Sequence, residues 1–212
     1  MRKRVGIMGG TFDPIHIGHL ILGESAYQQF ELHKVLFMPS GNPPHKKNRE
    51  GRASNEERIE MVRRAIASNQ HFELSLEEMH EQGYNYTRET LERLTMLYPD
   101  TDYYFIMGAD SLLNFETWKD PQEICRLCVI VAAVRDCMPM HQLDEQIARL
   151  NEKYCADIRK LETPNLDISS HVIRNWVAEG KSCRYYVPKD VLAYIEERKI
   201  YRNLPPDMCE SE

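Results

Sequence analysis

Apolar and polar positions alternate along this chain in blocks that predict strands separated by helices. Short apolar runs bounded by Gly, Pro or charged residues are typical of buried strands, whereas apolar positions three or four apart are typical of helices. The first pattern predicts strands at 5–8, 34–38, 72–76, 102–108, 127–134 and 158–161. The second predicts helices at 18–30, 54–68, 87–98 and 142–154, followed by a final helical part from 170 onward.

This order of elements predicts an α/β fold, a Rossmann-like doubly wound parallel sheet with a small C-terminal helical part at about 168–203. In such a sheet ligands bind at the carboxyl ends of the strands, so the turns that follow strands are candidate sites. A chain of 212 residues suits one domain, expected at 1–204. The tail at 205–212 is expected to be disordered.

The charge balance restricts the partners that we expect. The chain carries 27 Lys and Arg against 33 Asp and Glu, a formal net charge of −6. Broad nucleic-acid binding needs a basic face, so we expect no nucleic-acid partner. The sequence has neither a signal-peptide pattern nor the roughly 20 consecutive apolar residues of a membrane span. We therefore expect a cytoplasmic protein with no membrane partner.

The cysteines are expected to be reduced thiols, because disulfides are rare in the cytoplasm. Cys125 and Cys128 have the C-x-x-C spacing that some metal sites use. However, Cys128 leads directly into an apolar strand pattern, and no second C-x-x-C follows. These observations favour plain thiols over a metal site.

The most informative segment is 9–19, Gly-Gly-Thr-Phe-Asp-Pro-Ile-His-Ile-Gly-His, between the first predicted strand and helix. Glycines let backbone N–H groups approach a phosphate, and a helix N-terminus attracts anions. His16 and His19 add imidazole donors, and Gly18 leaves room for a ligand between them. The alternative is that both histidines only cap the helix.

Three single residues follow strands or begin helices and carry useful chemistry. Asp110, after the strand at 102–108, is placed to accept hydrogen bonds from a ribose or to cap a helix. Trp118 offers a stacking surface for a flat ring, or covers the edge of the core. Thr87 and the adjacent N–H groups suit a carboxylate, or cap the helix that begins there.

Two further segments suit anions. Ser169 and Ser170 begin a helix, and Arg174 lies one turn later on the same face as Ser170. Hydroxyl and guanidinium groups of this kind bind polyphosphates, although a capped helix with a surface arginine is the commoner case. In the loop at 40–52, which is rich in Pro, Gly and positive charge, two prolines give the following His45 and Lys46 a reproducible position.

Taken together, these motifs resemble the bacterial nicotinate-nucleotide adenylyltransferases, which join nicotinate mononucleotide to ATP in NAD synthesis. The resemblance covers nearly the whole chain, in the order 9–19, 43–46, 86–87, 108–111, Trp118 and 168–174. It implies a direct in-line attack of the mononucleotide phosphate on the α-phosphorus of ATP. It also implies Mg²⁺ bound through substrate phosphates, with no metal ligand from the protein, and leaves assembly into homo-oligomers open.

The resemblance assigns roles to individual positions. Catalytic roles fall on His16, His19, Lys46 and Arg174. ATP binding falls on Gly9, Gly10, Thr11, Phe12, His16, Gly18, His19, Gly108, Asp110, Ile168, Ser169, Ser170 and Arg174. Binding of the mononucleotide falls on Asp13, His45, Lys46, Thr87, Asp110 and Trp118.

The chain departs from the family pattern at two places. Lys119 replaces a residue that is often aromatic, and Arg-Asp-Cys at 135–137 replaces a common Arg-Pro-Gly. Two enzymatic alternatives remain open, an adenylyltransferase for nicotinamide mononucleotide and one for phosphopantetheine. A third alternative is a nucleotide-binding sensor without turnover.

Overall fold

The computed structural model describes residues 2–41, 52–79, 85–133, 140–164 and 167–202. Its strands are β1 (Lys3–Gly10), β2 (Lys34–Pro39), β3 (Phe72–Leu74), β4 (Thr101–Gly108), β5 (Cys128–Ala133) and β6 (Ile158–Leu161). Its helices are α1 (Ile17–Gln29), α2 (Asn55–Ile66), α3 (Thr87–Leu97), α4 (Ala109–Leu113), α5 (Pro121–Leu127), α6 (Met140–Tyr154), α7 (Ser170–Ala178) and α8 (Lys189–Arg198). A short 3₁₀ helix, η1 (Phe115–Thr117), follows α4.

The six strands form one parallel sheet in the order β3-β2-β1-β4-β5-β6. The chain passes outward from β1 to β3 and then returns to continue from β4 on the other side of β1. The carboxyl ends of β1 and β4 are therefore the point where the strand order reverses, which is where doubly wound sheets bind ligands. The expected fold class is confirmed.

Side chains alternate between the two faces of the sheet and build two cores. In β4, Tyr104 and Ile106 face a core shared with α1, α2, α7 and α8. Tyr103 and Phe105 face the opposite core, which α3, α4, α5 and α6 complete. This alternation follows from the two-residue repeat of a strand. Both faces are covered, so the central strands have continuous apolar runs, such as 103–107 in β4 and 128–133 in β5, as parallel strands usually do.

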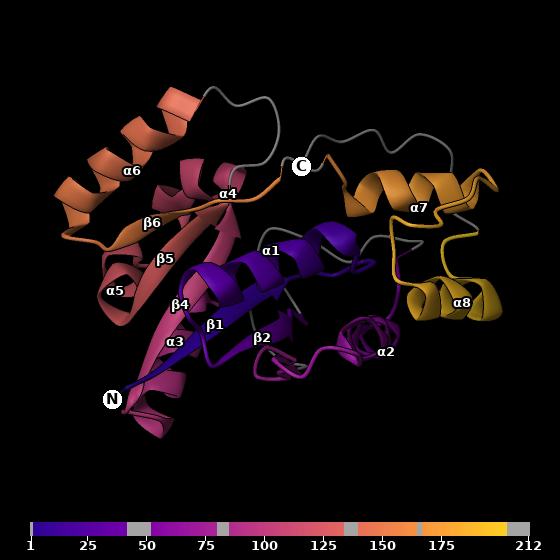
Figure 1. Ribbon diagram of the computed structural model, residues 1–212, viewed down its shortest axis with the longest axis horizontal. Helices are drawn as coiled ribbons and strands as arrows, with labels where there is room; N and C mark the ends of the chain where they lie inside the picture. The colour runs from indigo at the N-terminus through magenta and orange to yellow at the C-terminus, as the bar shows by residue number, and fades with distance from the viewer. Residues whose placement is uncertain (1, 42–51, 80–84, 134–139, 165–166, 203–212) are drawn as a thin grey trace.

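The C-terminal helices lie far along the chain from β1 but close to it in space. Figure 1 shows α7 and α8 at the end of the molecule opposite α6, next to α2. Ile173 of α7 and Val191 and Ile195 of α8 are buried in the same core as α1 and α2. This packing brings the last helices to the turn that follows β1.

The predicted elements agree with the structure except around 109–127. Three pieces there were not expected: α4, η1 and α5. They have 5, 3 and 7 residues, which is too short for a helical repeat to stand out from the sequence. By contrast, the predicted capping box of α2 is present, because Ser54 and Glu57 each accept the other's backbone N–H. Within the described part of the chain, the helices are too short or too polar to cross a membrane.

Candidate active site

A short connection joins β1 to α1 at the point where the strand order reverses. It runs from Thr11 to His16, which is the N-cap of α1 and has extended backbone angles of φ −141° and ψ 171°. The first turn of a helix has N–H groups without helical partners, and these face the carboxyl ends of the strands here. This connection, called the β1–α1 turn below, is therefore a place where an anion can bind.

The rings of the two histidines of the turn pack against each other at an interplanar angle of 34°. Their ring centroids lie 3.7 Å apart, and the backbone N–H of His16 donates to Nδ1 of His19 at 3.2 Å. A neutral imidazole that accepts at Nδ1 carries its proton on Nε2, so His19 presents an N–H donor at the far edge of its ring. Phe12 contacts this ring edge-on, with centroids 5.0 Å apart. His19 is half-buried, whereas His16 is only 1% exposed.

Gly18 is required by the histidine beside it. A Cβ atom at this position would lie 3.1 Å from both Nδ1 and Cε1 of His16. Ile168 lies 3.9 Å from the same point, on the side of α7. In this structure, the space that the sequence assigned to a ligand is thus partly filled by the His16 ring.

Arginines from three segments surround the β1–α1 turn. One guanidinium nitrogen of Arg58 donates to the carbonyl of Thr11 at 2.6 Å, and one of Arg174 donates to the carbonyl of Asp13 at 2.6 Å. Nε of Arg52 lies 3.9 Å from the Asp13 carboxylate. Burial lowers the pKa of Arg58, while Asp13 opposes that shift. Because arginine stays charged in proteins, these contacts place three cations around one carboxylate, which favours an anion nearby.

The start of α7 contacts the turn directly. Ser169 is the N-cap and accepts the backbone N–H of Val172 at 3.2 Å. The hydroxyl of Ser170 donates to the carbonyl of Pro14 at 2.9 Å. Arg174 is 8% exposed, so the alternative of a surface arginine is wrong. The structure therefore joins the first and last motifs of the sequence into one site.

An exposed carboxylate, that of Asp110, lies just after the end of β4. Gly108 is the N-cap of α4, so the cap position that the sequence left open for Asp110 is taken. Asp110 lies in the first turn of this short helix, and its side chain is exposed. It is available for a ribose hydroxyl at the edge where β1 and β4 end.

Thr87 and Trp118 lie on two separate segments, the start of α3 and the stretch that follows η1. Thr87 is the first residue of α3, and Tyr86 is the N-cap. Trp118 follows η1 and is half-buried, with its ring centroid 6.0 Å from that of Phe105 and 5.7 Å from that of Phe115. Trp118 thus covers the edge of the core, and this contact fixes its ring in place.

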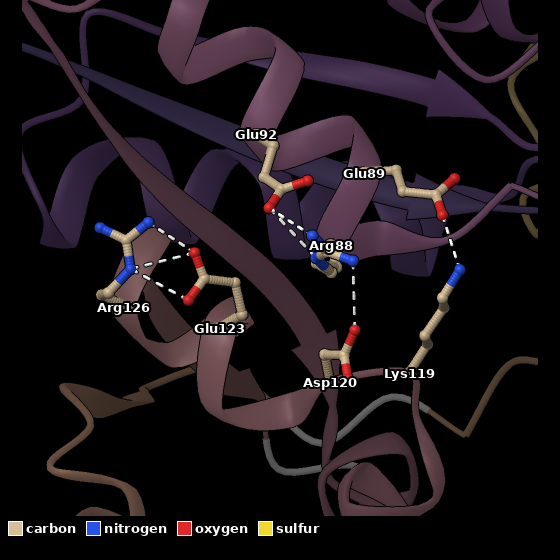
Figure 2. Close-up of polar contacts among 7 residues, drawn as sticks. All are labelled: Arg88, Glu89, Glu92, Lys119, Asp120, Glu123 and Arg126. Atoms are coloured by element: carbon tan, nitrogen blue, oxygen red, sulfur yellow. Dashed lines mark hydrogen bonds and ion pairs between the residues drawn. The ribbon is translucent and has the colours of Figure 1, made fainter.

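Three polar contacts join the start of α3 to the segment before α5, and Figure 2 shows the two ion pairs among them. Nζ of Lys119 donates to Glu89 at 2.7 Å and lies 4.1 Å from the ring centroid of Tyr86. Arg88 pairs with Asp120 at 3.2 Å. We call these five residues the α3–α5 bridge. The bridge residues flank Thr87 and Trp118 in sequence, so the bridge joins the two segments that carry them.

Comparison with known proteins places this geometry in a family. The Cytidylyltransferase-like family model matches residues 7–176. The chain is 44% identical over 199 residues to a probable nicotinate-nucleotide adenylyltransferase of Lachnoclostridium phytofermentans, covering 94% of this chain and 99% of the relative. A relative of the same name in Desulfitobacterium hafniense is 44% identical over 200 residues, covering 94% and 96%.

The chain belongs to the nicotinate-nucleotide adenylyltransferase family. Solved structures share its fold. The nicotinic acid mononucleotide adenylyltransferase of Plasmodium falciparum complexed with NaAD has a TM-score of 0.78 at 17% identity, covering 94% of this chain and 98% of that one. A putative nicotinate-nucleotide adenylyltransferase of Vibrio parahaemolyticus has a TM-score of 0.68 at 20% identity, covering 95% and 97%.

The structure accounts for one of the two departures from the family pattern. Lys119 packs its ammonium group against the ring of Tyr86 in a cation–π contact, 4.1 Å from the ring centroid. The other departure, 135–137, lies outside the described residues. His45 and Lys46 also lie outside them.

Two residues that the sequence did not single out contact the β1–α1 turn. Arg58 lies in the middle of α2, where a charged residue is expected at the surface, yet it is 4% exposed. Tyr201 donates to Asp13 from 188 residues away. A short sequence pattern cannot predict a contact between residues so far apart in the chain. Asp13 itself is 2% exposed and faces inward. This geometry does not favour the direct contact with the mononucleotide that the sequence predicted.

The C-x-x-C cysteines are plain thiols in the core. Cys125 and Cys128 are both buried and are not in a disulfide. Burial raises the pKa of Cys125 to about 11 and raises that of Cys128 further. In the described parts of the chain, no cluster of three or more His, Cys, Asp or Glu side chains is arranged to hold a metal ion.

Proposed function

We propose that this protein transfers the adenylyl group of ATP to nicotinate mononucleotide, giving nicotinate adenine dinucleotide and pyrophosphate. A phosphate oxygen of the mononucleotide forms the new bond to the α-phosphorus. The bond from that phosphorus to the bridging oxygen breaks, and its electron pair leaves with pyrophosphate. The attacking oxygen is already anionic, so the step needs no general base.

The chemical difficulty is to bring two anions together and to stabilise the charge that develops on pyrophosphate. The observation that carries the proposal is the His16–His19 pair at the N-terminus of α1, beside the reversal of the strand order. His19 would donate its Nε2 proton to the phosphates. His16, buried against it, completes the pair, and Ser169, Ser170 and Arg174 would border the triphosphate.

Mg²⁺ fits this site as a partner of the substrates. The described residues form no carboxylate cage, and Mg²⁺ commonly binds through phosphates and waters. When bound there, it would supply neutralising charge between the two sets of phosphates. The histidines, the helix N-termini and Arg174 would orient those phosphates.

The nicotinate end would bind between the start of α3 and the segment before α5. The N–H groups at Thr87 begin a helix and suit a carboxylate, and the Trp118 ring is held by the core beside it. Asp110 would accept a ribose hydroxyl. From the sequence we further propose that His45 and Lys46 approach the reacting phosphates, that the protein is cytoplasmic, and that self-association is open to test.

The test is pyrophosphate release from ATP and Mg²⁺ with three acceptors at equal concentration: nicotinate mononucleotide, nicotinamide mononucleotide and phosphopantetheine. We expect a strong preference for the acid, because the amide lacks the negative charge that the N-terminus of α3 would bind. Arg174→Lys provides a second arm and should lower turnover, since lysine cannot hold the Asp13 carbonyl and a phosphate at once.

Each outcome discriminates among the alternatives. Equal use of acid and amide would overturn the assignment of Thr87 and Trp118 while retaining adenylyl transfer. Preference for phosphopantetheine would overturn the substrate. If no acceptor supports pyrophosphate release but ATP binds, the protein is a nucleotide sensor.

A further inference from the structure

A buried hydrogen bond joins the β1–α1 turn to the last described residues of the chain. The hydroxyl of Tyr201 donates to Oδ1 of Asp13 at 2.7 Å. The same oxygen accepts the backbone N–H of Ala53, just before α2, at 3.2 Å. Asp13 is 2% exposed and Tyr201 is 4% exposed. One carboxylate oxygen therefore connects three segments that are far apart in the sequence.

The second carboxylate oxygen lies among cations. Oδ2 of Asp13 is 3.8 Å from a guanidinium nitrogen of Arg174 and 3.9 Å from Nε of Arg52, and it makes no hydrogen bond within the described part of the protein. The Tyr201 contact is thus one of only two hydrogen bonds that orient this side chain there. Losing it would free the carboxylate to rotate toward the arginines.

The backbone on both sides of this contact has an unusual conformation. Phe12, which precedes Asp13, has φ 50°, and Tyr201 has φ 67°. Lys199, the C-cap of α8, also has a positive φ, of 55°. Residues with a Cβ adopt this conformation only where surrounding contacts require it. The chain turns sharply after α8 and so directs the Tyr201 side chain to the β1–α1 turn.

The C-terminal part contacts the turn at further points that surround the histidines. The carbonyl of Tyr186 accepts the N–H of Ile17, the residue between His16 and Gly18, at 2.9 Å. Arg174 and Ser170 hold the carbonyls of Asp13 and Pro14. Within this set, Tyr201 adds a hydrogen bond to the Asp13 side chain, which Arg174 approaches only as an ion-pair partner at 3.8 Å.

From this arrangement we infer that Tyr201 is a positioning residue for adenylyl transfer. Its hydroxyl orients Asp13, and Asp13 holds the β1–α1 turn in the form that packs His16 against His19 and keeps Arg174 beside them. This inference rests on the proposed function. It assigns to Asp13 an internal role in place of direct contact with the mononucleotide.

The hydroxyl of Tyr201 is suited to act as a permanent donor. Burial, and then the neighbouring Asp13 carboxylate, raise its pKa well above the usual value. The proton therefore stays on Tyr201 throughout the range in which enzymes of this kind work. The contact is a constant structural link rather than a pH-dependent switch.

Tyr201→Phe tests the inference because it removes the hydroxyl and keeps the ring. Tyr103→Phe is the matched control: Tyr103 is 3% exposed, and its hydroxyl donates to the carbonyl of Leu94 on the other side of the sheet, at 3.3 Å. We expect Tyr201→Phe to lower kcat about tenfold, with KM for each substrate within about threefold, because misplaced donors act mainly on the transition state. Tyr103→Phe should stay within about twofold of the wild-type kcat.

Asp13→Ala extends the test to the residue that accepts the Tyr201 hydrogen bond. Because each substitution breaks the same hydrogen bond, the double variant with Tyr201→Phe should lose no more kcat than the more damaging single variant. Losses that multiply would overturn the inference. If Asp13→Ala does not fold, Tyr201→Phe with its control decides the question alone.

A readout that does not need turnover separates this inference from the proposed function. The side-chain ¹⁵N and ¹H signals of His16 and His19 should shift in Tyr201→Phe and remain in place in Tyr103→Phe. Unchanged signals together with a kcat within about twofold of wild type would overturn the positioning role. An equal loss of kcat in Tyr103→Phe would overturn it as well. A wild-type protein without transferase activity would refute the proposed function, and the histidine signals would then decide the inference.

Discussion

The side chain of His19 caps the backbone of His16 while the two rings pack against each other. The N–H of His16 donates to Nδ1 of His19 at 3.2 Å, and the ring centroids are 3.7 Å apart. One nitrogen of His19 thus caps the helix, so the capping role that the sequence offered is present. Capping at Nδ1 is compatible with the proposed anion binding, because the two roles would use opposite edges of the same ring.

Replacing His19 by asparagine should separate these two roles. The Asn oxygen can still accept near the start of α1, but the distant N–H donor is lost. We expect kcat for pyrophosphate release to fall by about 10² to 10³, as on loss of one preorganised donor, with little change in the melting temperature.

His33→Asn is the matched control for this substitution. Nδ1 of His33 also accepts a backbone N–H, that of Arg4, at 3.2 Å, but it lies at the amino end of the sheet. Its kcat should equal that of the wild type. A His19→Asn protein with undiminished kcat would exclude His19 from the reaction.

Gly18→Ala should lower activity without unfolding the protein. The new methyl group would lie 3.1 Å from the His16 ring and must displace it. Alanine also favours a helix over glycine by about 1 kcal/mol, which offsets the strain. We expect an approximately tenfold lower kcat at a nearly unchanged melting temperature. Ser25→Ala, elsewhere on α1, controls for helix propensity, and equal activities of the two variants would contradict the role of Gly18.

Breaking the α3–α5 bridge should weaken binding of the mononucleotide and leave ATP binding alone. Lys119→Met and Arg88→Met together remove both ion pairs, so Thr87 and Trp118 lose the contacts that join their segments. Exposed ion pairs are individually weak, so we expect KM for nicotinate mononucleotide to rise only about threefold. The same increase should appear in the wild type at high salt.

Arg126→Met is the control for the bridge. Arg126 pairs with Glu123 within α5, on the same side of the molecule but without joining two elements (Figure 2). Its KM should be that of the wild type. If Arg126→Met and the double variant have the same KM, the bridge has no role in substrate binding.

Glu116 should stabilise the folded protein at neutral pH, and this stabilisation should be lost in acid. Hydrogen bonds from Arg149 and then Lys153 lower its pKa from 4.5 to about 2. The pKa of Glu116 is lower in the folded state than in the unfolded state. The stabilisation is therefore complete above pH 4.5 and disappears as the pH falls toward 2. The melting temperature of the wild type should therefore fall more steeply over this range than that of Glu116→Gln. Glu145→Gln, an exposed position of α6, should behave as the wild type, and parallel curves for all three would refute the prediction.

The strands and long helices could be predicted because each repeats its pattern over many residues. The β6 prediction at 158–161 matches Ile158–Leu161, and β2 differs only by adding Pro39. The short helices between β4 and β5 were missed because five to seven residues carry too little periodicity. Their stability comes from packing against the core instead, as with Leu112 and Ile124.

The candidate site was predictable where its chemistry is local. His16 and His19 are three residues apart at the start of a helix, and this spacing alone indicates that their side chains lie near each other. The sequence left open whether Arg174 binds phosphates or is a surface arginine, and the structure shows it buried against the carbonyl of Asp13. That burial depends on where α7 packs, which no short segment of sequence specifies.

The sequence by itself determined the order of strands and helices, the fold class and the position of the turn that follows β1, because periodicity, glycine and helix caps act over a few residues. Only the tertiary structure decided that Arg58 and Tyr201 contact this turn and that Asp13 faces inward. The physical reason is that burying apolar surface on both faces of the sheet brings distant segments together. A buried carboxylate must then be satisfied by whatever donors that packing supplies.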